Sequence, residues 1–407
     1  MSFLRKLSAI KTPPSENSPS GGVAHAVSGG GVLPVGVFCG EDAVEPDTLP
    51  GIREETPWGV VRVIRERLPL ASLYGTACLE HVRSVDGAYL ASFSRDPALS
   101  CFSPDDLLFV DTETTGLAGG TGTIAFLIGL GRIESESLLI EQFLLETFGY
   151  EHAALHAVHE RVQQSGAIAS FNGKSFDLPL LRTRWVMHRV PHATDMPHLD
   201  LLHGSRRQLG RSVTSHRLQV LEREILGYTR EGDIPGHEIP EAYFDFLRTG
   251  ESERLHTIVK HNRDDIVAMV ALLARLHRRF HDIEPVHCAE EFLALATRAY
   301  EQRNWERCLR DASKSLFSTF HGKTASEAAL LGARAARQLK QYDKAQRVLE
   351  HALSAFEHYA MPDVHLALAK LYEHQLGSVK DALFHAEKSQ SAESTASYQR
   401  RMARLRL

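Results

Sequence analysis

The stretch "LLFVDTETTGLAGGTGTIAFLIGLG", residues 107–131, joins two apolar runs through a short glycine-rich segment. Its runs "LLFVDTE" and "TIAFLIGLGRIE" have the aliphatic and aromatic content of strands, and the glycines between them suit a turn. A third run, "LLIEQFLLE", follows after the short turn "SES". We therefore expect three consecutive antiparallel strands, the first of which ends on two carboxylates, Asp111 and Glu113.

The segments that follow alternate between helix and strand. "EHAALHAVHERVQQS" has helical periodicity, "AIASFNG" is typical of a fourth strand, and "SFDLPLLRTRWVMHR" is helical again. Three antiparallel strands followed by a helix, a strand and a helix make a mixed sheet. The predicted fold class is therefore α/β, with a mixed sheet flanked by helices at residues 105–283.

Composition sets limits on the class of protein. At 407 residues, with 43% hydrophobic and 24% charged residues, the chain has room for two or three domains. No apolar run approaches the roughly 20 residues of a membrane span, and the start has no secretion signal, so we expect a cytoplasmic location. The five cysteines are scattered without a CxxC pair, which predicts reduced thiols. A net charge of −5 argues against wholesale coating of nucleic acid.

Three further regions flank the predicted α/β domain. Residues 1–54 are expected to be a disordered arm, because residues 11–34 are crowded with Pro, Ser and Gly. Alternating segments predict a small β-rich appendage at residues 55–104. Residues 285–400 are helical with a period of 37, which aligns Trp305, Tyr342 and Val379. They resemble tetratricopeptide-type repeats, which bind protein partners; an unrepeated helical bundle remains the alternative.

The two carboxylates at the end of the first strand are candidates for a metal site. Alternate residues of a strand share a face, so Asp111 and Glu113 project together. Their mutual repulsion is relieved if a divalent cation lies between them, and hard oxygen ligands suit Mg²⁺ or Mn²⁺. The pair alone leaves open a second interpretation, in which the acids cap the next turn without any metal.

Other polar residues can join this site. Asp177 follows a strand in a loop that opens a helix, where it either reaches the strand-end acids or serves as an N-cap. In "RLHTIVKHNRDDIVAMVALLARL", His261 and Asp265 are one helical turn apart and share a face, with Asn262 alongside. A surface position remains the alternative for His261. Asp264 points about 100° away, and we expect it to be exposed to solvent.

These acids occur in a familiar order. A DxE pair, an Asp about 65 residues further on and an Asp on a late helix resemble the DEDD superfamily of 3′–5′ exonucleases, which have the ribonuclease H-like fold. "FVDTETTG" and "FNGKSFDLPLL" are close to its first two motifs. Within it the chain looks most like the YprB-like ribonuclease H-like proteins, on "HLDLLHGSRR", "SHRLQVLEREILGY", "IPGHEIPEAYFDFLRTG" and a trailing helical-repeat region.

The third motif departs from the family pattern. One subclass has Tyr four residues before the last Asp, and the other has His five before it. Here His261 stands four before Asp265, at the spacing of the Tyr, and Lys260 stands five before it. His261 is therefore a candidate general base or water-orienting group whose role the resemblance leaves in doubt.

Two further motifs need separate interpretation. "GLAGGTGT" has no Lys and lies between two strands, so it does not predict a nucleoside triphosphate site. Its glycines suit a tight turn that lets a substrate strand approach the backbone. Asp200 is either an extra acid near the site or a structural loop residue.

The resemblance implies a two-metal-ion 3′–5′ exonuclease. The catalytic candidates are Asp111, Glu113, Asp177, His261 and Asp265, of which the four acids would hold two Mg²⁺ or Mn²⁺ ions. Residues 181–230 contain nine arginines and four acids, an excess that suits phosphate contact; a solvated helix surface with arginines packed on aromatic side chains is the alternative. The candidate nucleic-acid contacts are Thr112, Asn172, Arg182, Arg206 and Arg207. The residues do not distinguish DNA from RNA, and a scaffold that binds nucleic acid without cutting it is the competing hypothesis.

Overall fold

The computed structural model describes residues 49–116, 122–191, 196–286 and 288–406. In this part of the chain, a seven-stranded sheet has the order β1-β2-β7-β6-β5-β8-β9, and β3 and β4 pair separately. The strands are β1 (Ile52–Thr56), β2 (Gly59–Pro69), β3 (Leu73–Tyr74), β4 (Ala77–Cys78), β5 (Leu107–Thr114), β6 (Ala125–Glu134), β7 (Ser137–Leu144), β8 (Ala167–Ser170) and β9 (His198–Asp200).

The sheet is mixed, as the sequence predicts. β1, β2, β7, β6 and β5 pair antiparallel in that order, whereas β8 and β9 are added parallel to β5. The predicted tight turn between β5 and β6 includes residues 117–121, which lie outside the described residues. The α/β fold class with a helix-flanked mixed sheet is confirmed.

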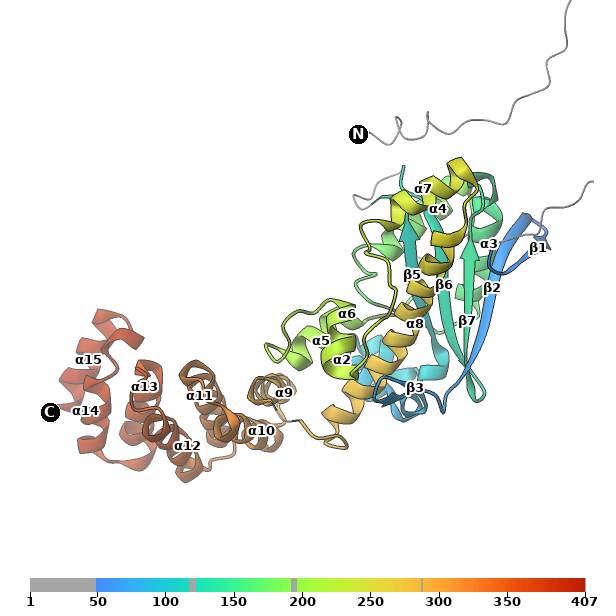
Figure 1. The fold of residues 1–407 in the computed structure, drawn as a ribbon. Coiled ribbons are helices and arrows are strands. Elements are labelled where there is room, and N and C mark those ends of the chain that lie inside the picture. The colour runs from blue at the N-terminus through green and yellow to red at the C-terminus, as the bar shows by residue number, and fades with distance from the viewer. Residues whose placement is uncertain (1–48, 117–121, 192–195, 287, 407) are drawn as a thin grey trace, which may run out of the picture.

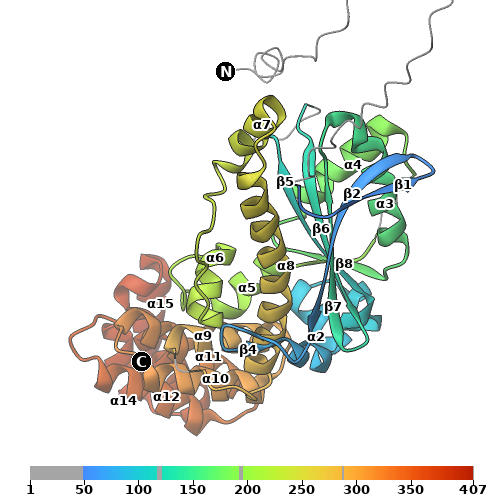
Figure 2. The same cartoon turned by 45° about the vertical axis from the view of Figure 1, so that its right-hand side comes forward.

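Helices lie on both faces of this sheet (Figures 1 and 2). α3 and α4 pack on one face, and the long α8 crosses the other. The helical segments of this part are η1 (Leu79–Ser84), α2 (Gly87–Ser94), η2 (Pro97–Cys101), η3 (Pro104–Asp106), η4 (Phe148–Tyr150), α3 (Glu151–Gln163), α4 (Asp177–His188), α5 (Leu201–Leu209), α6 (Leu218–Leu221), η5 (Glu222–Leu226), α7 (Ile239–Thr249) and α8 (Glu253–Phe280).

The buried start of β5 contributes to two hydrophobic cores. Leu107 and Phe109 belong to the cluster that contains the C-terminal half of α8, whereas Leu108 and Val110 belong to the cluster that contains α3 and α4. Successive side chains of a strand point to opposite faces, so a continuous apolar run is buried on both sides. Asp111 continues the series that faces α8.

The N-terminal prediction is partly wrong. Residues 1–48 of the predicted arm lie outside the described residues, but β1 begins at Ile52, inside that arm, and pairs with β2. β2 then pairs with β7. Within residues 55–104, β2 therefore extends the main sheet, whereas β3 and β4 pair separately and residues 79–101 are mostly helical. The partner strand is distant in sequence, so local alternation cannot predict this pairing.

Beyond α8 the described residues form helical hairpins. The residues aligned by the period of 37, Trp305, Tyr342 and Val379, each begin a helix. The helical region is thus confirmed, and the likeness to tetratricopeptide repeats stays a prediction. The segments are α9 (Ala289–Glu301), α10 (Trp305–Ser318), α11 (Gly322–Gln338), α12 (Tyr342–Ala355), α13 (Pro362–Leu371), η6 (Tyr372–Leu376), α14 (Val379–Glu387), η7 (Gln390–Ala392) and α15 (Thr395–Leu405).

The sheet domain and the helical region share α9. Leu295 of α9 is buried in the same cluster as the C-terminal half of α8. The guanidinium of Arg298 lies over the rings of Phe280 and Tyr89, at 4.2 and 5.1 Å from their centroids. α9 therefore covers apolar surface of the sheet domain, although the predicted boundary at residues 283–285 assigns it to the repeats alone.

Two expectations from composition concern the described residues. None of their helices is both long and apolar enough to cross a membrane. Cys78, Cys101, Cys288 and Cys308 are free thiols, and Cys39 lies outside the described part.

Candidate metal centre

Two glycines of β6 bring α8 close to the carboxylates of β5. The strand pairing sets Asp111 opposite Gly129. A Cβ atom at Gly129 would lie 2.2 Å from the side-chain oxygen of Asn262, and one at Gly131 would lie 2.4 Å from Ile266. Because glycine has no side chain at these positions, α8 lies directly on the sheet beside Asp111.

Asn262 fixes the position of Asp111. Its amide nitrogen donates to Asp111 Oδ2 at 2.8 Å, and its amide oxygen accepts from Gln142 Nε2 at 2.8 Å. Asn262 is fully buried, so both ends of its amide need such partners. The sequence places Asn262 beside the site, but it gives no signal for Gln142 of β7.

Asp177 reaches the same region from the start of α4. It is the first residue of that helix, and Phe176 occupies the N-cap position, so the structure does not give Asp177 the capping role. Thr112 Oγ1 donates to Asp177 Oδ1 at 2.5 Å. Burial raises the pKa of Asp177 to about 6, although the hydrogen bond from Thr112 opposes the shift.

α8 contributes His261 and Asp265 from one face. His261 Nε2 lies 3.9 Å from Glu113 Oε1 and 3.9 Å from Asp265 Oδ2. The side chain of His261 is only 9% exposed, so it is not the surface histidine of the alternative interpretation. The structure thus places His261 between an acid of β5 and an acid of its own helix.

The acids of this cluster oppose one another's ionisation. Burial, followed by the charges of Asp265 and Asp177, raises the pKa of Asp111 well above its usual range. Burial and the charges of Asp111, Asp265 and Asp177 do the same to the pKa of Glu113. The four predicted metal ligands, called the acid cluster below, are therefore close enough to act on one another's charge.

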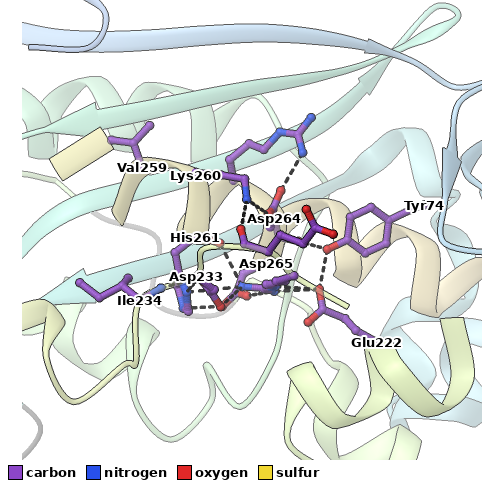
Figure 3. A network of polar contacts seen from close by, with 12 residues as sticks. Tyr74, Glu222, Asp233, Ile234, Val259, Lys260, His261, Asp264 and Asp265 are labelled. Atoms are coloured by element: carbon purple, nitrogen blue, oxygen red, sulfur yellow. Dashed lines mark hydrogen bonds and ion pairs between the residues drawn. The ribbon is translucent and has the colours of Figure 1, made fainter. Parts of the chain in front are cut away.

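Arg230 is a cation beside the acid cluster. Its guanidinium pairs with Asp265 and donates to Glu222 Oε1 at 2.8 Å. It also lies 3.7 Å from Asp233 Oδ2 and 3.5 Å from His261 Nδ1. The acids around it come from η5, from the loop before α7 and from α8 (Figure 3). The side chain of Arg230 is 4% exposed, so its charge acts mainly on these groups.

Asp233 holds one ring nitrogen of His261. Asp233 Oδ1 lies 2.7 Å from His261 Nδ1, and Gln219 Nε2 donates to the other oxygen of Asp233 at 2.9 Å. The other ring nitrogen, Nε2, is the one that faces Glu113 and Asp265. A carboxylate that accepts from Nδ1–H leaves Nε2 with a free lone pair.

Asp264 is buried, contrary to the prediction that it is exposed. It is 1% exposed, and its carboxylate accepts from Arg263 at 2.7 Å. The hydroxyl of Tyr74, on β3, lies 3.4 Å from the backbone oxygen of Asp264 (Figure 3). The short β3–β4 pair covers this side of α8, and helical periodicity cannot predict cover from so distant a segment.

Arg230, Glu222 and Asp233 have no clear signal as site residues in the sequence. They lie in or just after "SHRLQVLEREILGY", where the chain has little regular periodicity. Arg230 belongs to the arginine-rich segment, in which it does not differ from its neighbours. The resemblance of this stretch to the YprB-like proteins is the one signal that could have identified these three residues.

Two predicted nucleic-acid contacts help to shape the loops of the site. Thr112 binds Asp177. Asn172 adopts a left-handed backbone conformation, with φ of 68°, and its N–H donates to Asp200 Oδ1 at 2.9 Å. Asp200 also accepts from the N–H of Lys174 at 3.1 Å. Asp200 therefore has the structural loop role.

The predicted arginine patch is not one surface. Arg182 and Arg206 are exposed on α4 and α5. Arg207 donates to the backbone oxygen of Phe93 and lines a groove that α9 and α11 also border. Arg184 is buried in an ion pair with a glutamate of α3. A count of charges along the chain cannot separate these cases, because helical arginines alternate between faces.

The donor set has the chemistry of a site for Mg²⁺ or Mn²⁺. Asp111, Glu113, Asp177 and Asp265 offer carboxylate oxygens, the ligands that these ions prefer. Among the described residues, no three of these carboxylates have ligand atoms within 4.8 Å of one another. Asp265 is paired with Arg230 instead. The four residues fit the ion by type, charge and location. Their carboxylate oxygens are spaced more widely than in a closed ligand shell.

Comparison with known proteins agrees with this fold. Residues 108–277 match the family described as the RNase_H superfamily. Over 347 residues the chain is 28% identical to the uncharacterized protein YprB of Bacillus subtilis (strain 168), with 81% of this chain and 80% of the relative covered. The family match runs from β5 into the last turns of α8 and includes all five predicted catalytic residues. Residues 108–277 thus form a ribonuclease H-like domain, which indicates a nuclease-type function.

Proposed function

We propose that this protein is a metal-dependent nuclease that removes nucleotides from the 3′ end of DNA or RNA with two divalent ions, Mg²⁺ or Mn²⁺. The observation that supports it most is the acid cluster between β5 and α8, where burial and the charges of the neighbouring acids raise the pKa of Asp111 and Glu113. The order of these acids along the chain resembles that of the DEDD exonucleases.

Three acids of the cluster have separate means of positioning. Asn262 holds Asp111, Thr112 holds Asp177, and Asp265 projects from α8. Divalent ions bound to these carboxylates and Glu113 would supply charge neutralisation and an activated water for hydrolysis. Arg230 balances part of the negative charge before any ion binds.

His261 is the proposed general base. Its Nε2 faces the acids, and it would accept a proton from the attacking water while Asp233 keeps Nδ1 in the protonated form. The charge of Asp233 would then stabilise the imidazolium. The water oxygen forms the new bond to phosphorus, the bond from phosphorus to the 3′ oxygen breaks, and that oxygen takes a proton from solvent water to become the 3′-hydroxyl of the shortened strand.

The test is a product analysis with the purified full chain. Single- and double-stranded DNA and RNA, labelled at the 5′ or at the 3′ end, are incubated with Mn²⁺, with Mg²⁺ or with EDTA. A 3′–5′ exonuclease shortens 5′-labelled strands stepwise and releases labelled mononucleotide at once from 3′-labelled strands. Internal fragments from both substrates would show an endonuclease instead.

A scaffold that binds nucleic acid without cutting it is the second candidate. The ion pair between Arg230 and Asp265 and the wide spacing of the carboxylate oxygens favour it. In this case the same substrates are bound but yield no products with any of the metals. Both proposals include a protein partner bound by the helical region and a cytoplasmic location.

A further inference from the structure

A second group of metal-ligating side chains lies at the C-terminal end of α8, beyond the proposed active site. One ring nitrogen each of His277 and His281 and one carboxylate oxygen of Asp86 lie within 4.8 Å of one another. His277 follows Asp265 by twelve residues, which corresponds to about 18 Å along a helix. The group is therefore separate from the acids described above.

Two helix ends bring these three residues together. His277 lies in the last turn of α8, and His281 is its C-cap, so their spacing of four residues places them on one face. Asp86 is the N-cap of α2, where its Oδ1 accepts from the N–H of Tyr89 at 2.7 Å. The second oxygen of Asp86 is free of this capping bond, and the C-terminal end of α8 attracts positive charge.

His277 provides an independent indication of a ligand. It is 3% exposed, and its Nε2 is buried without a hydrogen-bond partner among the described residues. Its Nδ1 lies 3.5 Å from Ser84 Oγ. Burial, and then the neighbouring His281, lowers the pKa of His277 to about 4, so the ring is neutral at neutral pH and its lone pair is available. Metal-bound histidines commonly use their second nitrogen in such a hydrogen bond.

We propose that Asp86, His277 and His281 bind one divalent transition-metal ion of the zinc class. Two imidazoles and one carboxylate suit Zn²⁺ or Co²⁺ in a four-coordinate site whose remaining position is taken by water. Imidazole ligands discriminate against Mg²⁺, which prefers oxygen. The site therefore differs in metal as well as in place from the carboxylate cluster.

The bound ion would lie beside the contact between the sheet domain and the helical region. It would join the start of α2 to the end of α8, next to Phe280, whose ring lies under Arg298 at 4.2 Å and under Arg307 at 4.0 Å. These guanidinium groups come from α9 and α10 and repel a cation. We therefore expect weaker binding than in a structural zinc site with four protein ligands.

The test is metal binding by the full chain. Co²⁺ and Zn²⁺ are titrated in excess Mg²⁺, which occupies oxygen-only sites, and Co²⁺ is followed by its visible absorption. Asp86→Asn removes the charge but keeps an N-cap residue, and His281→Gln changes an exposed ring. His237→Gln, at a histidine that is 76% exposed, is the matched control.

We predict one equivalent of bound metal, with affinity lowered about ten- to a hundredfold in both variants and unchanged in the control. Zn²⁺ should raise the Tm of the wild-type chain and leave that of His281→Gln unchanged. Equal binding by the wild-type chain and both variants, or no saturable binding, would overturn the proposal. The assay contains no nucleic acid, so its outcome is independent of nuclease activity.

Discussion

At the scale of single residues, the acid cluster has an energetic cost that a cation can relieve. The pKa values of Asp111, Glu113 and Asp177 are raised above their usual range because burial and mutual repulsion disfavour ionisation. The folded chain therefore binds protons that the unfolded chain releases. The stabilisation from these protons is fully present below the pKa values of the unfolded chain, 3.8 for Asp and 4.5 for Glu. It is lost as the pH rises through the higher pKa values that the same groups have in the folded chain.

The first prediction concerns stability without metal. In EDTA, the free energy of unfolding of Asp111→Asn minus that of the wild-type chain should grow as pH rises from about 4 through 6 and beyond, because the variant lacks one of the repelling charges. Urea denaturation across this range measures the effect, with Asp105→Asn as the control at an aspartate that is 58% exposed. A variant Asp111→Asn that is less stable than the wild-type chain at neutral pH would show that repulsion does not dominate the acid cluster.

The second prediction concerns the proposed base. His261→Ala should lower the single-turnover rate by about two to four orders of magnitude, the usual contribution of a positioned base, and leave the Mn²⁺ affinity nearly unchanged. Asp233→Asn should lower the same rate by less, because it removes only the group that orients the ring. His261→Tyr should recover part of the loss if water orientation is the main need. A rate for His261→Ala within a few-fold of wild type would exclude His261 from catalysis.

At the scale of secondary-structure elements, the contact between β6 and α8 positions the site. Gly129 and Gly131 leave space that Asn262 and Ile266 fill. The acids on β5 and those on α8 meet only because the helix lies this close to the sheet. A side chain introduced at Gly129 or Gly131 should therefore disturb the geometry of the site as well as the packing of the core.

The third prediction tests this contact. Gly131→Ala places a Cβ atom 2.4 Å from Ile266 Cγ2 and should destabilise the fold by about 1–3 kcal/mol. Ile266→Ala removes the opposing atoms, so the double variant should lose less stability than the sum of the two single variants. Gly236→Ala, at a glycine with open space around it, is the control. Strict additivity in denaturant melts would show that the two positions do not interact.

The sequence predicts the elements better than the contacts between them. Apolar periodicity defines β5, β6, β7, α3 and α4, and the spacing of His261 and Asp265 correctly places them on one helical face. The positions of Arg230 and Asp233 depend on how an irregular loop folds over α8, for which the chain has no periodic signal. The burial of Asp264 and the pairing of β2 with β7 likewise depend on segments that are distant in sequence.

At the scale of the whole molecule, α9 belongs to both parts of the protein. It packs against α5 and α2 through Leu295 and Arg298, and against α10 through Ala296 and Ala299. Figure 1 shows the remaining helices extending away from the sheet domain. The proposed metal ligands of the nuclease site all lie before α9, so the outer hairpins should be dispensable for hydrolysis.

The fourth prediction concerns truncation. A chain that ends at Ser318 keeps α9 and α10 and should retain metal-dependent hydrolysis. A chain that ends at Ile283 uncovers Phe280 and Tyr89 and should have a lower Tm and aggregate more readily. Thermal melts and activity of both chains provide the measurement. Equal stability of the two chains would show that α9 does not stabilise the sheet domain.

The most direct test of a metal-dependent nuclease site is to measure cleavage by matched variants with and without metal. Wild type, Asp111→Asn and Asp105→Asn are compared at equal concentration on 5′-labelled single-stranded DNA and RNA, with Mn²⁺ and with EDTA. We predict stepwise shortening by wild type and Asp105→Asn in Mn²⁺, and no products from Asp111→Asn or in EDTA. Cleavage by Asp111→Asn at the wild-type rate, or cleavage by the wild-type chain in EDTA, would contradict the claim that these carboxylates form a metal-dependent nuclease site.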